Sequence, residues 1–321
     1  MAELAAAKGE FLRQILADTH PIWHDGLDFE RYIQFWDAQL RTPWGSGHLD
    51  RVALVEKGRV ITSAKRYDLS GRIDGRIRRV LGIGAVFTTP ARRGEGQAQR
   101  LLQEIIDSAE AEGYEYAMLF SEIDPAFYER LDFVPVPLVE SELEVSLKAG
   151  APAMLVRAAD DRDMPAVVEM SARRVEGARF ALDRGEEWIR YGLAKRRLLA
   201  GLGPPGLREV EFLVAEEGHQ AVAYVISLVH EGRWFIEDAG DRDPSGARLG
   251  AMLQVMLART PHLPPPAINA WLPPGFLPPQ VKRTRTHSTP EVMMIRPLND
   301  RTLPLPPIEA TQVAFARLDY F

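Results

Sequence analysis

The residues best suited to chemistry lie between positions 85 and 98, where a predicted strand runs through a glycine-containing turn into a helix. Gly94 and Gly96 let the backbone approach a ligand closely, and the dipole of the helix that follows favours negative charge at its first turn. Several backbone N–H groups of such a turn can point at one anion. Arg92 and Arg93 add formal positive charge there. The segment therefore predicts a binding site for a pyrophosphate group.

The glycine pattern differs from the two common phosphate-binding motifs. No Lys-Ser or Lys-Thr pair follows the glycines, as a Walker loop requires. Gln99 stands where a dinucleotide-binding motif would have its third glycine. The spacing alone leaves open an ordinary turn from strand to helix that binds no ligand.

The elements that must position this turn follow from the periodicity of the apolar residues. Residues 79–88 are mostly apolar and predict a central strand, and apolar residues recur with helical spacing from 98 to 109. Asp28 is a suitable N-cap for an earlier helix. Another helix is expected over residues 3–17, with Pro21 close to its end. The first half is thus expected to mix helices with strands, including a hairpin formed by residues 52–55 and 60–64.

The second half of the chain repeats this pattern. Five apolar positions of the helix predicted over 247–259 match five positions of the earlier helix at a constant offset, and they are Leu249, Met252, Leu253, Met256 and Leu257. The segment Lys148 to Pro152 is a suitable boundary. We therefore predict an α/β protein with mixed sheets and two related units, over 1–148 and 153–297, followed by a tail over 298–321.

Two motifs carry a resemblance to a known family. The pattern Arg93-x-x-Gly96-x-Ala98 resembles the Gln/Arg-x-x-Gly-x-Gly/Ala motif of the GNAT N-acetyltransferases. About thirty residues later, the segment 127–133 resembles the Phe-Tyr-x-x-x-Gly-Phe segment of the same family. Asp132 departs from the usual glycine, which can alter the local turn but leaves Tyr128 in place. The resemblance covers residues 50–140 well and implies tandem GNAT-like units, of which the first is catalytic.

The resemblance implies acetyl-CoA as co-substrate and gives roles to particular residues. The strand residues Val86, Phe87 and Thr88 would pair with the pantetheine amides. The pyrophosphate would be bound by the turn that consists of Arg92, Arg93, Gly94, Glu95, Gly96, Gln97 and Ala98. Tyr128 would protonate the departing CoA thiolate, a role that suits a phenol because its pKa of about 10 lies close to that of a thiol.

The general base has three candidates. Glu122 is the first, because it follows the strand that ends near the expected position of the acetyl group. A chain of water molecules is the second. The third is the C-terminal carboxylate of Phe321, since related tandem acetyltransferases use a chain terminus in the active site.

The second unit is expected to be degenerate. Aligning its helix with the first places Ala247 opposite Gly96 and Leu249 opposite Ala98, while Pro244 lacks an N–H group. A phosphate site is therefore not expected there, and the second unit would shape the acceptor pocket or support the fold.

The acceptor is predicted less directly. Residues 119–123 resemble the fungal lysine acetyltransferase group and its bacterial relatives, which implies small amines or lysine as acceptors. An aminoglycoside-type polyamine is the second possibility. The alternative from another class is a non-catalytic acyl-CoA sensor or interaction protein.

The composition limits which binding partners and metals the chain is expected to have. The 321 residues carry a formal net charge of −6 and contain no cysteine, which excludes disulfides, thiolate catalysis and Cys-ligated metals. An acidic chain does not need nucleic acid or an anionic membrane as partner. The spacing of His20 and His24 across Pro21 does not favour a metal pair. We therefore expect a cytoplasmic enzyme that binds a small-molecule amine, with no metal, nucleic acid or membrane.

Overall fold

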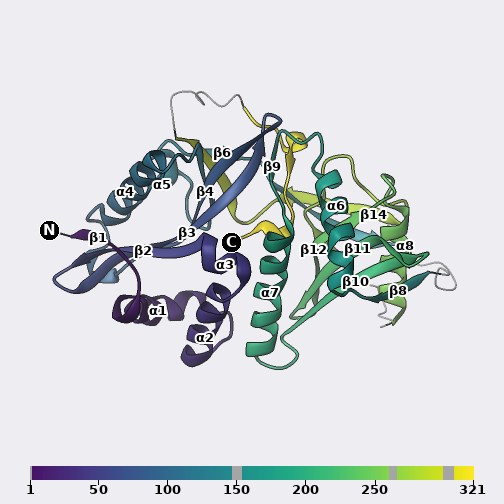
Figure 1. The fold of residues 1–321 in the computed structure, drawn as a ribbon, viewed down its shortest axis with the longest axis horizontal. Helices are drawn as coiled ribbons and strands as arrows, with labels where there is room; N and C mark the ends of the chain where they lie inside the picture. The colour runs from purple at the N-terminus through teal and green to yellow at the C-terminus, as the bar shows by residue number, and fades with distance from the viewer. Residues whose placement is uncertain (1, 147–153, 260–265, 299–306) are drawn as a thin grey trace. The chain divides into compact units, whose positions relative to one another are not determined.

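The computed structural model describes residues 2–146, 154–259, 266–298 and 307–321, which form two compact units (Figure 1). The first unit consists of Met1–Val136, Pro290–Ile308 and Phe321, and the second of Pro137–Thr289 and Glu309–Tyr320. The boundary expected at Lys148 to Pro152 lies outside the described residues. The ranges 1–148 and 153–297 stay a prediction about the two repeats, because the compact units are discontinuous in sequence.

The first unit is built on one mixed sheet with the strand order β1-β2-β3-β4-β5-β15-β6. Its strands are β1 (Glu3–Ala6), β2 (Leu49–Glu56), β3 (Arg59–Ile73), β4 (Arg76–Thr88), β5 (Tyr116–Ser121), β6 (Val134–Val136) and β15 (Val292–Pro297). All neighbours pair antiparallel except β4 and β5, which are parallel. The helices are α1 (Gly9–Trp23), α2 (Phe29–Leu40), α3 (Pro43–His48), α4 (Gln97–Ala111) and α5 (Ala126–Glu129), with a 3-10 turn, η1 (Pro90–Arg92).

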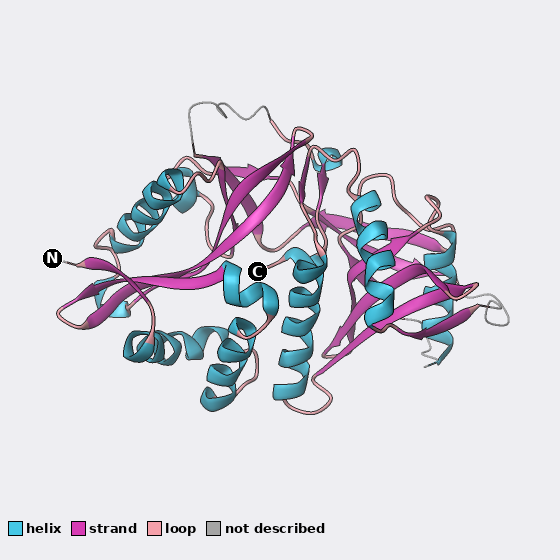
Figure 2. Ribbon diagram, viewed as in Figure 1, coloured by secondary structure: helices cyan, strands magenta, loops and turns pink. Residues whose placement is uncertain are grey.

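Helices cover both faces of this sheet (Figure 2). The apolar stripe of α4, from Leu101 to Ala109, packs on one face against strand residues that include Leu54 and Ile83. Residues of α1 lie on the other face, where Ile15 packs against Ala53. Asp28 caps α2 as expected, because its carboxylate accepts a hydrogen bond from the Arg31 N–H at 2.9 Å.

Two local predictions for the N-terminal region are wrong. Residues 3–6 form the edge strand β1, which pairs with Val52–Val55 of β2, instead of the first turn of a helix. Pro21 lies inside the last turn of α1, which ends only at Trp23. A proline near a helix end removes a single hydrogen bond, so the turn is retained.

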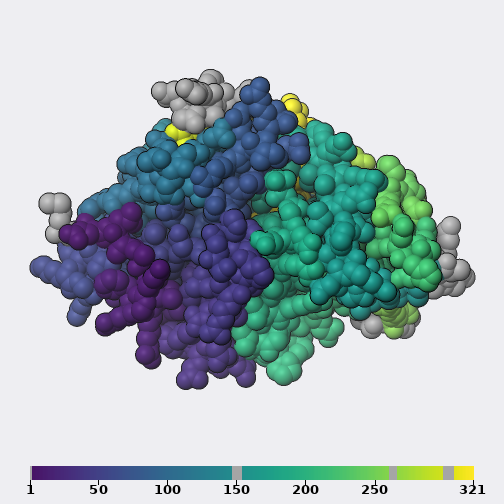
Figure 3. Space-filling view, in the orientation of Figure 1, coloured from purple at the N-terminus to yellow at the C-terminus, as the bar shows by residue number. Residues whose placement is uncertain are grey.

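The β3–β4 hairpin is longer than the sequence pattern indicated. Its pairing continues from Thr62↔Thr88 to Ile73↔Arg76, and the tip residues Asp74 to Ile77 are exposed at the surface (Figure 3). The arginines at 72, 76, 78 and 79 all belong to this hairpin.

The second unit has its own mixed sheet, in the order β14-β7-β13-β12-β11-β10-β8. Its strands are β7 (Val139–Val145), β8 (Leu155–Ala158), β10 (Arg208–Glu217), β11 (Gln220–His230), β12 (Arg233–Asp241), β13 (Ile268–Ala270) and β14 (Val281–Ser288). The helices are α6 (Met164–Arg174), α7 (Glu186–Leu202) and α8 (Ala247–Arg259), with the 3-10 turn η2 (Asp161–Asp163). Residues of α6 and α7 pack on one face, and the apolar stripe of α8 belongs to a separate core cluster.

The described end of the chain is not a loose tail. The 3-10 turns η4 (Ala310–Gln312) and η5 (Arg317–Asp319) flank β16 (Val313–Ala314), which pairs parallel with β9 (Phe180–Leu182). Both strands belong to the second unit, and all five of their residues are buried.

Candidate active site

The turn into α4 has the conformation that the glycines predicted. Gly94 has φ 81° and Gly96 has φ 75°, values in the left-handed region that favours glycine. A Cβ added at either position would meet no atom within 4 Å, so the space beside the turn is open. Gly96 is the N-cap of α4, and no side chain caps the helix. The first-turn N–H groups are therefore available to an anion.

The strand before the turn diverges from its neighbour at the same place. β4 and β5 pair from Val80↔Tyr116 to Ile83↔Leu119, although β4 continues to Thr88 and β5 to Ser121. The pairing of β4 with β3 also shifts between Ser63 and Lys65, and Ala85 has φ 47°. A bulge with a non-glycine residue at positive φ is a strained feature that often marks a functional site.

The residues expected to pair with pantetheine lie beyond this divergence. Val86 is partly exposed, whereas the Phe87 side chain is buried and its carbonyl accepts a hydrogen bond from Thr62 Oγ1 at 2.8 Å. The Thr88 hydroxyl donates to Thr62 Oγ1 at 3.1 Å. Within the described chain no strand pairs with this part of β4 on the β5 side, so a ligand could take that edge.

The two arginines of the turn differ in their partners. Arg92 forms ion pairs with Glu95 at 2.7 Å and Glu56 at 2.9 Å, and these hydrogen bonds raise its pKa. Arg93 is exposed, and its Nε donates to the Thr88 carbonyl at 3.3 Å. Arg93 is therefore the better placed of the two to meet a phosphate, while Arg92 is held by the two glutamates.

Glu122 and Tyr128 both lie in the segment that follows β5 in the first unit. Tyr128 is 7% exposed, and its ring packs edge-on against Phe127 and Phe133. Burial, and then the charge of Glu122, raise the pKa of Tyr128 to about 12. Glu122 is exposed, and its Oε2 accepts a hydrogen bond from Trp23 Nε1 at 3.4 Å.

The last residue of the chain lies on the sheet of the first unit. The ring of Phe321 contacts Tyr67, with ring centroids 4.5 Å apart, and Phe120, at 5.4 Å. A Cβ added at Gly84 would lie 3.6 Å from a Phe321 carboxylate oxygen. The terminal carboxylate thus lies beside the point where β4 and β5 diverge.

The second unit has a related turn with a different environment. β12 and β13 pair from Trp234↔Ile268 to Ile236↔Ala270 and then diverge, as β4 and β5 do. Before α8 the left-handed residue is Gly246, at φ 72°, so the sequence alignment that placed Ala247 opposite Gly96 is wrong by one residue. A Cβ at Gly246 would lie 2.9 Å from Phe276, and the Asp241 carboxylate accepts a hydrogen bond from Leu249 N–H at 2.8 Å. This turn is covered and capped by its own chain.

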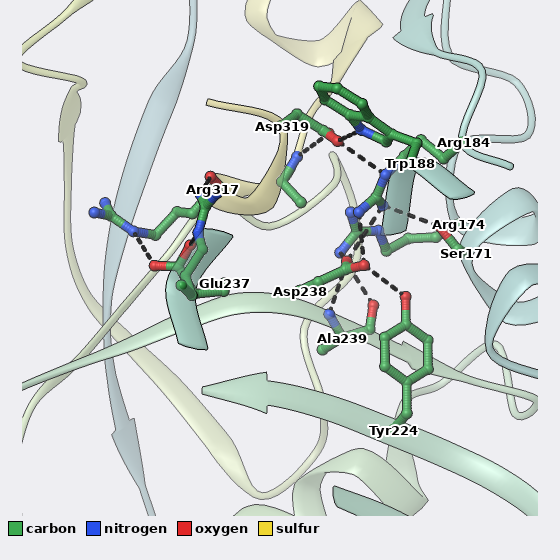
Figure 4. Close-up of polar contacts among 12 residues, drawn as sticks. Ser171, Arg174, Arg184, Trp188, Tyr224, Glu237, Asp238, Ala239, Arg317 and Asp319 are labelled. Atoms are coloured by element: carbon green, nitrogen blue, oxygen red, sulfur yellow. Dashed lines mark hydrogen bonds and ion pairs between the residues drawn. The ribbon is translucent and has the colours of Figure 1, made fainter. Parts of the chain in front are cut away.

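Buried charges in the second unit are also paired (Figure 4). Arg184 forms ion pairs with Asp238 at 2.6 Å and with Asp319 at 3.0 Å, and all three side chains are at most 1% exposed. Burial alone would raise the pKa of Asp238, but Arg184 and Arg174 together lower it. The Tyr224 hydroxyl donates to Asp238 at 2.9 Å, and Trp188 Nε1 donates to Asp319 at 2.9 Å.

The first half of the chain matches a known family. Residues 25–136 match the family model described as Acetyltransferase (GNAT) domain. The turn at Gly94 and Gly96 and the side chain of Tyr128 both lie within the matched residues, and the prediction of an acyltransferase is confirmed. The resemblance to the fungal lysine acetyltransferase group stays a prediction.

Solved structures share the fold over nearly the whole chain. A probable N-acyltransferase from Enterococcus faecalis V583 is 12% identical with a TM-score of 0.70, and 93% of this chain covers 73% of it. A GCN5-related N-acetyltransferase from Anabaena variabilis is 13% identical with a TM-score of 0.68 and the same coverages. A tandem GNAT protein from the clavulanic acid biosynthesis pathway is 13% identical with a TM-score of 0.54, at 93% and 99% coverage. No curated protein matches the chain. These likenesses confirm the mixed α/β fold, and a tandem GNAT protein is among the structures that share it.

The described residues also bear on metal and membrane binding. No group of three or more His, Cys, Asp or Glu side chains is arranged to hold a metal ion in the described ranges. Among the described helices, none is both long and apolar enough to cross a membrane.

Sequence reasoning missed several features of this site. The bulge at Ala85 and the buried side chains of Arg51 and Tyr67 were not singled out. A charged residue directly before an apolar run, as Arg51 is before Val52-Ala53-Leu54-Val55, is the signal that could have identified one of them.

Proposed function

We propose that this chain transfers an acetyl group from acetyl-CoA to a primary amine of a small molecule or of lysine, in the cytoplasm. The observation that carries the proposal is the uncapped turn at Gly94 and Gly96, which lies at the C-terminal end of a diverging strand. The N–H groups from Arg93 to Ala98 would bind the pyrophosphate, and the open edge of β4 at Val86 to Thr88 would receive the pantetheine. Acetyl-CoA supplies the activated thioester.

In the proposed chemistry one side chain accepts a proton and another donates one. Glu122 would accept a proton from the acceptor ammonium, which leaves a neutral amine able to attack the thioester carbonyl. Tyr128 would donate its hydroxyl proton to the sulfur as the carbon–sulfur bond breaks. Its raised pKa keeps the hydroxyl protonated at neutral pH, which is the form that an acid needs.

The terminal carboxylate stays a candidate for the base, because Phe321 lies beside Gly84 at the divergence of the strands. Two variants separate the candidates: Glu122→Gln removes one carboxylate, and a chain that ends at Tyr320 moves the other. A base must be deprotonated to accept a proton, so whichever variant loses the acidic limb of the pH dependence of kcat/KM identifies the base. If neither does, a water chain is the base.

The test of the function is a pair of measurements on the full chain. Calorimetry with acetyl-CoA is expected to show one site, and thiol release is expected with at least one member of a panel of lysine, small amines and aminoglycoside-type polyamines. Binding without thiol release across the panel would favour the non-catalytic acyl-CoA sensor. Absence of binding at saturating acetyl-CoA would reject both.

A further inference from the structure

The first unit contains a buried guanidinium without a counter-charge. Arg51 lies in β2 and is 3% exposed. Its Nε and Nη1 atoms are buried and have no hydrogen-bond partner among the described residues. Burial lowers the pKa of Arg51, and the groups that oppose this effect are the hydroxyls of Tyr32 and Tyr67. No carboxylate in the described ranges forms an ion pair with Arg51.

Such an arrangement is unfavourable unless an anion completes it. A buried charge is normally paired, because removal of an ion from water costs several kcal/mol even after the protein relaxes. The second unit follows this rule, since Arg184 is buried against Asp238 and Asp319. The absence of a partner for Arg51 is therefore a specific feature of the first unit.

Other unsatisfied polar groups lie in the same unit. The Trp36 ring stacks under the Arg51 guanidinium, 4.9 Å from its centre, and Trp36 Nε1 is buried without a partner in the described chain. The Tyr67 hydroxyl is likewise buried without one. Lys65 Nζ lies 5.1 Å from the Trp36 ring, so two cations flank one indole. These donors and cations suit an anion and would not suit a second ammonium.

The strand register relates Arg51 to the point where β4 and β5 diverge. Arg51 pairs with Lys65, and Lys65 pairs with Gly84, so the three residues form one row across β2, β3 and β4. Two strand spacings amount to about 10 Å between the backbones of Arg51 and Gly84. The adjacent residues Val52 and Leu54 face α4, whereas Ala53 packs against α1. By the alternation of side chains, Arg51 faces the same side as Ala53, opposite α4, where Trp36 of α2 lies against it.

We propose that Arg51 binds a carboxylate of the acceptor, and that the preferred acceptors are amines that also carry a carboxylate, as free amino acids do. The inference rests on the proposed function, because it assumes that the amine reacts near Gly84. The planar guanidinium suits a carboxylate, which it can bind through two parallel hydrogen bonds. No covalent step is added to the reaction.

The test compares amines that differ only in the carboxylate. Thiol release is measured with lysine and cadaverine, and with ornithine and putrescine, because each diamine equals its amino acid without the carboxylate. The wild-type kcat/KM is expected to be about 10- to 100-fold higher for the amino acid, the range for a hydrogen bond to a charged group. Arg51→Met is expected to bring this ratio close to one, and Arg51→Lys to leave part of it. The control Arg59→Met, at the exposed β2–β3 turn, should keep the wild-type ratio.

The outcomes separate this inference from the proposed function. Thiol release with no preference for the carboxylate, or a preference that survives Arg51→Met, would overturn the inference and leave the acetyltransferase in place. If no amine is acetylated, the proposed function fails. The inference is then judged by whether lysine, and not cadaverine, raises the melting temperature of the wild type but not of Arg51→Met.

A measurement of stability tests the remaining alternative, in which the Phe321 carboxylate is the partner of Arg51. If Arg51 has no counter-charge in the free protein, its removal costs no ion pair, so the melting temperature of Arg51→Met should equal or exceed that of the wild type. A marked decrease that is absent when the chain already ends at Tyr320 would show an internal ion pair and overturn the inference.

Discussion

The turns that precede α4 and α8 have the same backbone conformation and opposite surroundings. Each has a left-handed glycine before the first helical residue, Gly96 in one unit and Gly246 in the other. The first turn is exposed and has no side-chain cap. In the second, Asp241 binds the N–H of Leu249, and Phe276 covers the glycine. A site for an external anion thus depends on what the chain leaves unsatisfied, and not on the glycine alone.

The same contrast holds for the buried cations. Arg184 in the second unit is neutralised by two aspartates, whereas Arg51 in the first is buried without one among the described residues. Protein interiors normally satisfy their polar groups. The unit that leaves a buried charge without a counter-charge is the one that we expect to bind ligands, and the unit that pairs its buried charges is expected to provide stability.

Removal of the charge of Arg184 should give the largest change. Arg184→Met leaves Asp238 and Asp319 buried without their main partner, so the free energy of unfolding should fall by about 3–5 kcal/mol. Denaturant unfolding measures the loss. The matched control is Arg190→Met in α7, the helix that follows Arg184 in the chain, because Arg190 is paired at the surface with Asp161 and Glu186 and should contribute less than about 1 kcal/mol. Equal effects of the two variants would show that the buried ion pairs of Arg184 contribute no more to stability than surface pairs do.

A carboxylate placed in the first turn should make it resemble the second. Gly96→Asp is expected to weaken acetyl-CoA binding at least about 100-fold, which corresponds to roughly 2.8 kcal/mol, because the carboxylate would take the first-turn N–H groups and repel the pyrophosphate. Calorimetry measures the affinity. Gly113→Asp is the control, since Gly113 also has positive φ, at 85°, and open space, but lies at the other end of α4. Similar losses of affinity in both variants would indicate backbone strain instead of a blocked anion site.

Sequence reasoning could predict the turn because its determinants are local. Glycine at a left-handed position, a strand before it and an amphipathic helix after it are all visible within fifteen residues. The helix over 247–259 was predicted at its observed bounds for the same reason. The edge strand at Glu3–Ala6 was missed because its pairing with Val52–Val55 is a long-range contact.

The rest of the site could not be predicted, because it depends on which residues meet in space. The glutamate partners of Arg92 are Glu95, which is nearby in sequence, and Glu56, which is 36 positions away. The row that joins Arg51 to Gly84 exists only through the register of three strands. The residue that caps α8, Asp241, could be recognised only once its carboxylate was found on the Leu249 N–H group.

The two units also differ in the surroundings of a buried tyrosine. Tyr224 donates to a carboxylate, whereas Tyr128 lies among aromatic rings and has a pKa raised to about 12. Tyr128→Phe should lower kcat by about 100-fold, the low end of the range for acid catalysis. Because an acid must be protonated, the raised pKa should keep the wild-type kcat from falling on the alkaline side up to about pH 10, where an ordinary phenol would ionise.

The control for Tyr128 is Tyr114→Phe in the same unit. Tyr114 is 5% exposed, and burial followed by Asp68 raises its pKa to about 12 as well, so it has a similar titration without the proposed role. Full pH profiles of kcat for both variants measure the difference. An unchanged profile for Tyr128→Phe, or an equal decrease for Tyr114→Phe, would reject Tyr128 as the acid.

Opening the second turn should have the smallest effect. Asp241→Ala removes the cap from α8, and the loss of one such hydrogen bond should lower the free energy of unfolding by about 1 kcal/mol. Asp241→Asn keeps an acceptor oxygen and should lose less. Neither change should create a second acetyl-CoA site, because Phe276 still covers Gly246 and Pro244 has no N–H group. Calorimetric titration of Asp241→Ala measures the stoichiometry, and a second equivalent of bound acetyl-CoA would show that one carboxylate was all that separated the two turns.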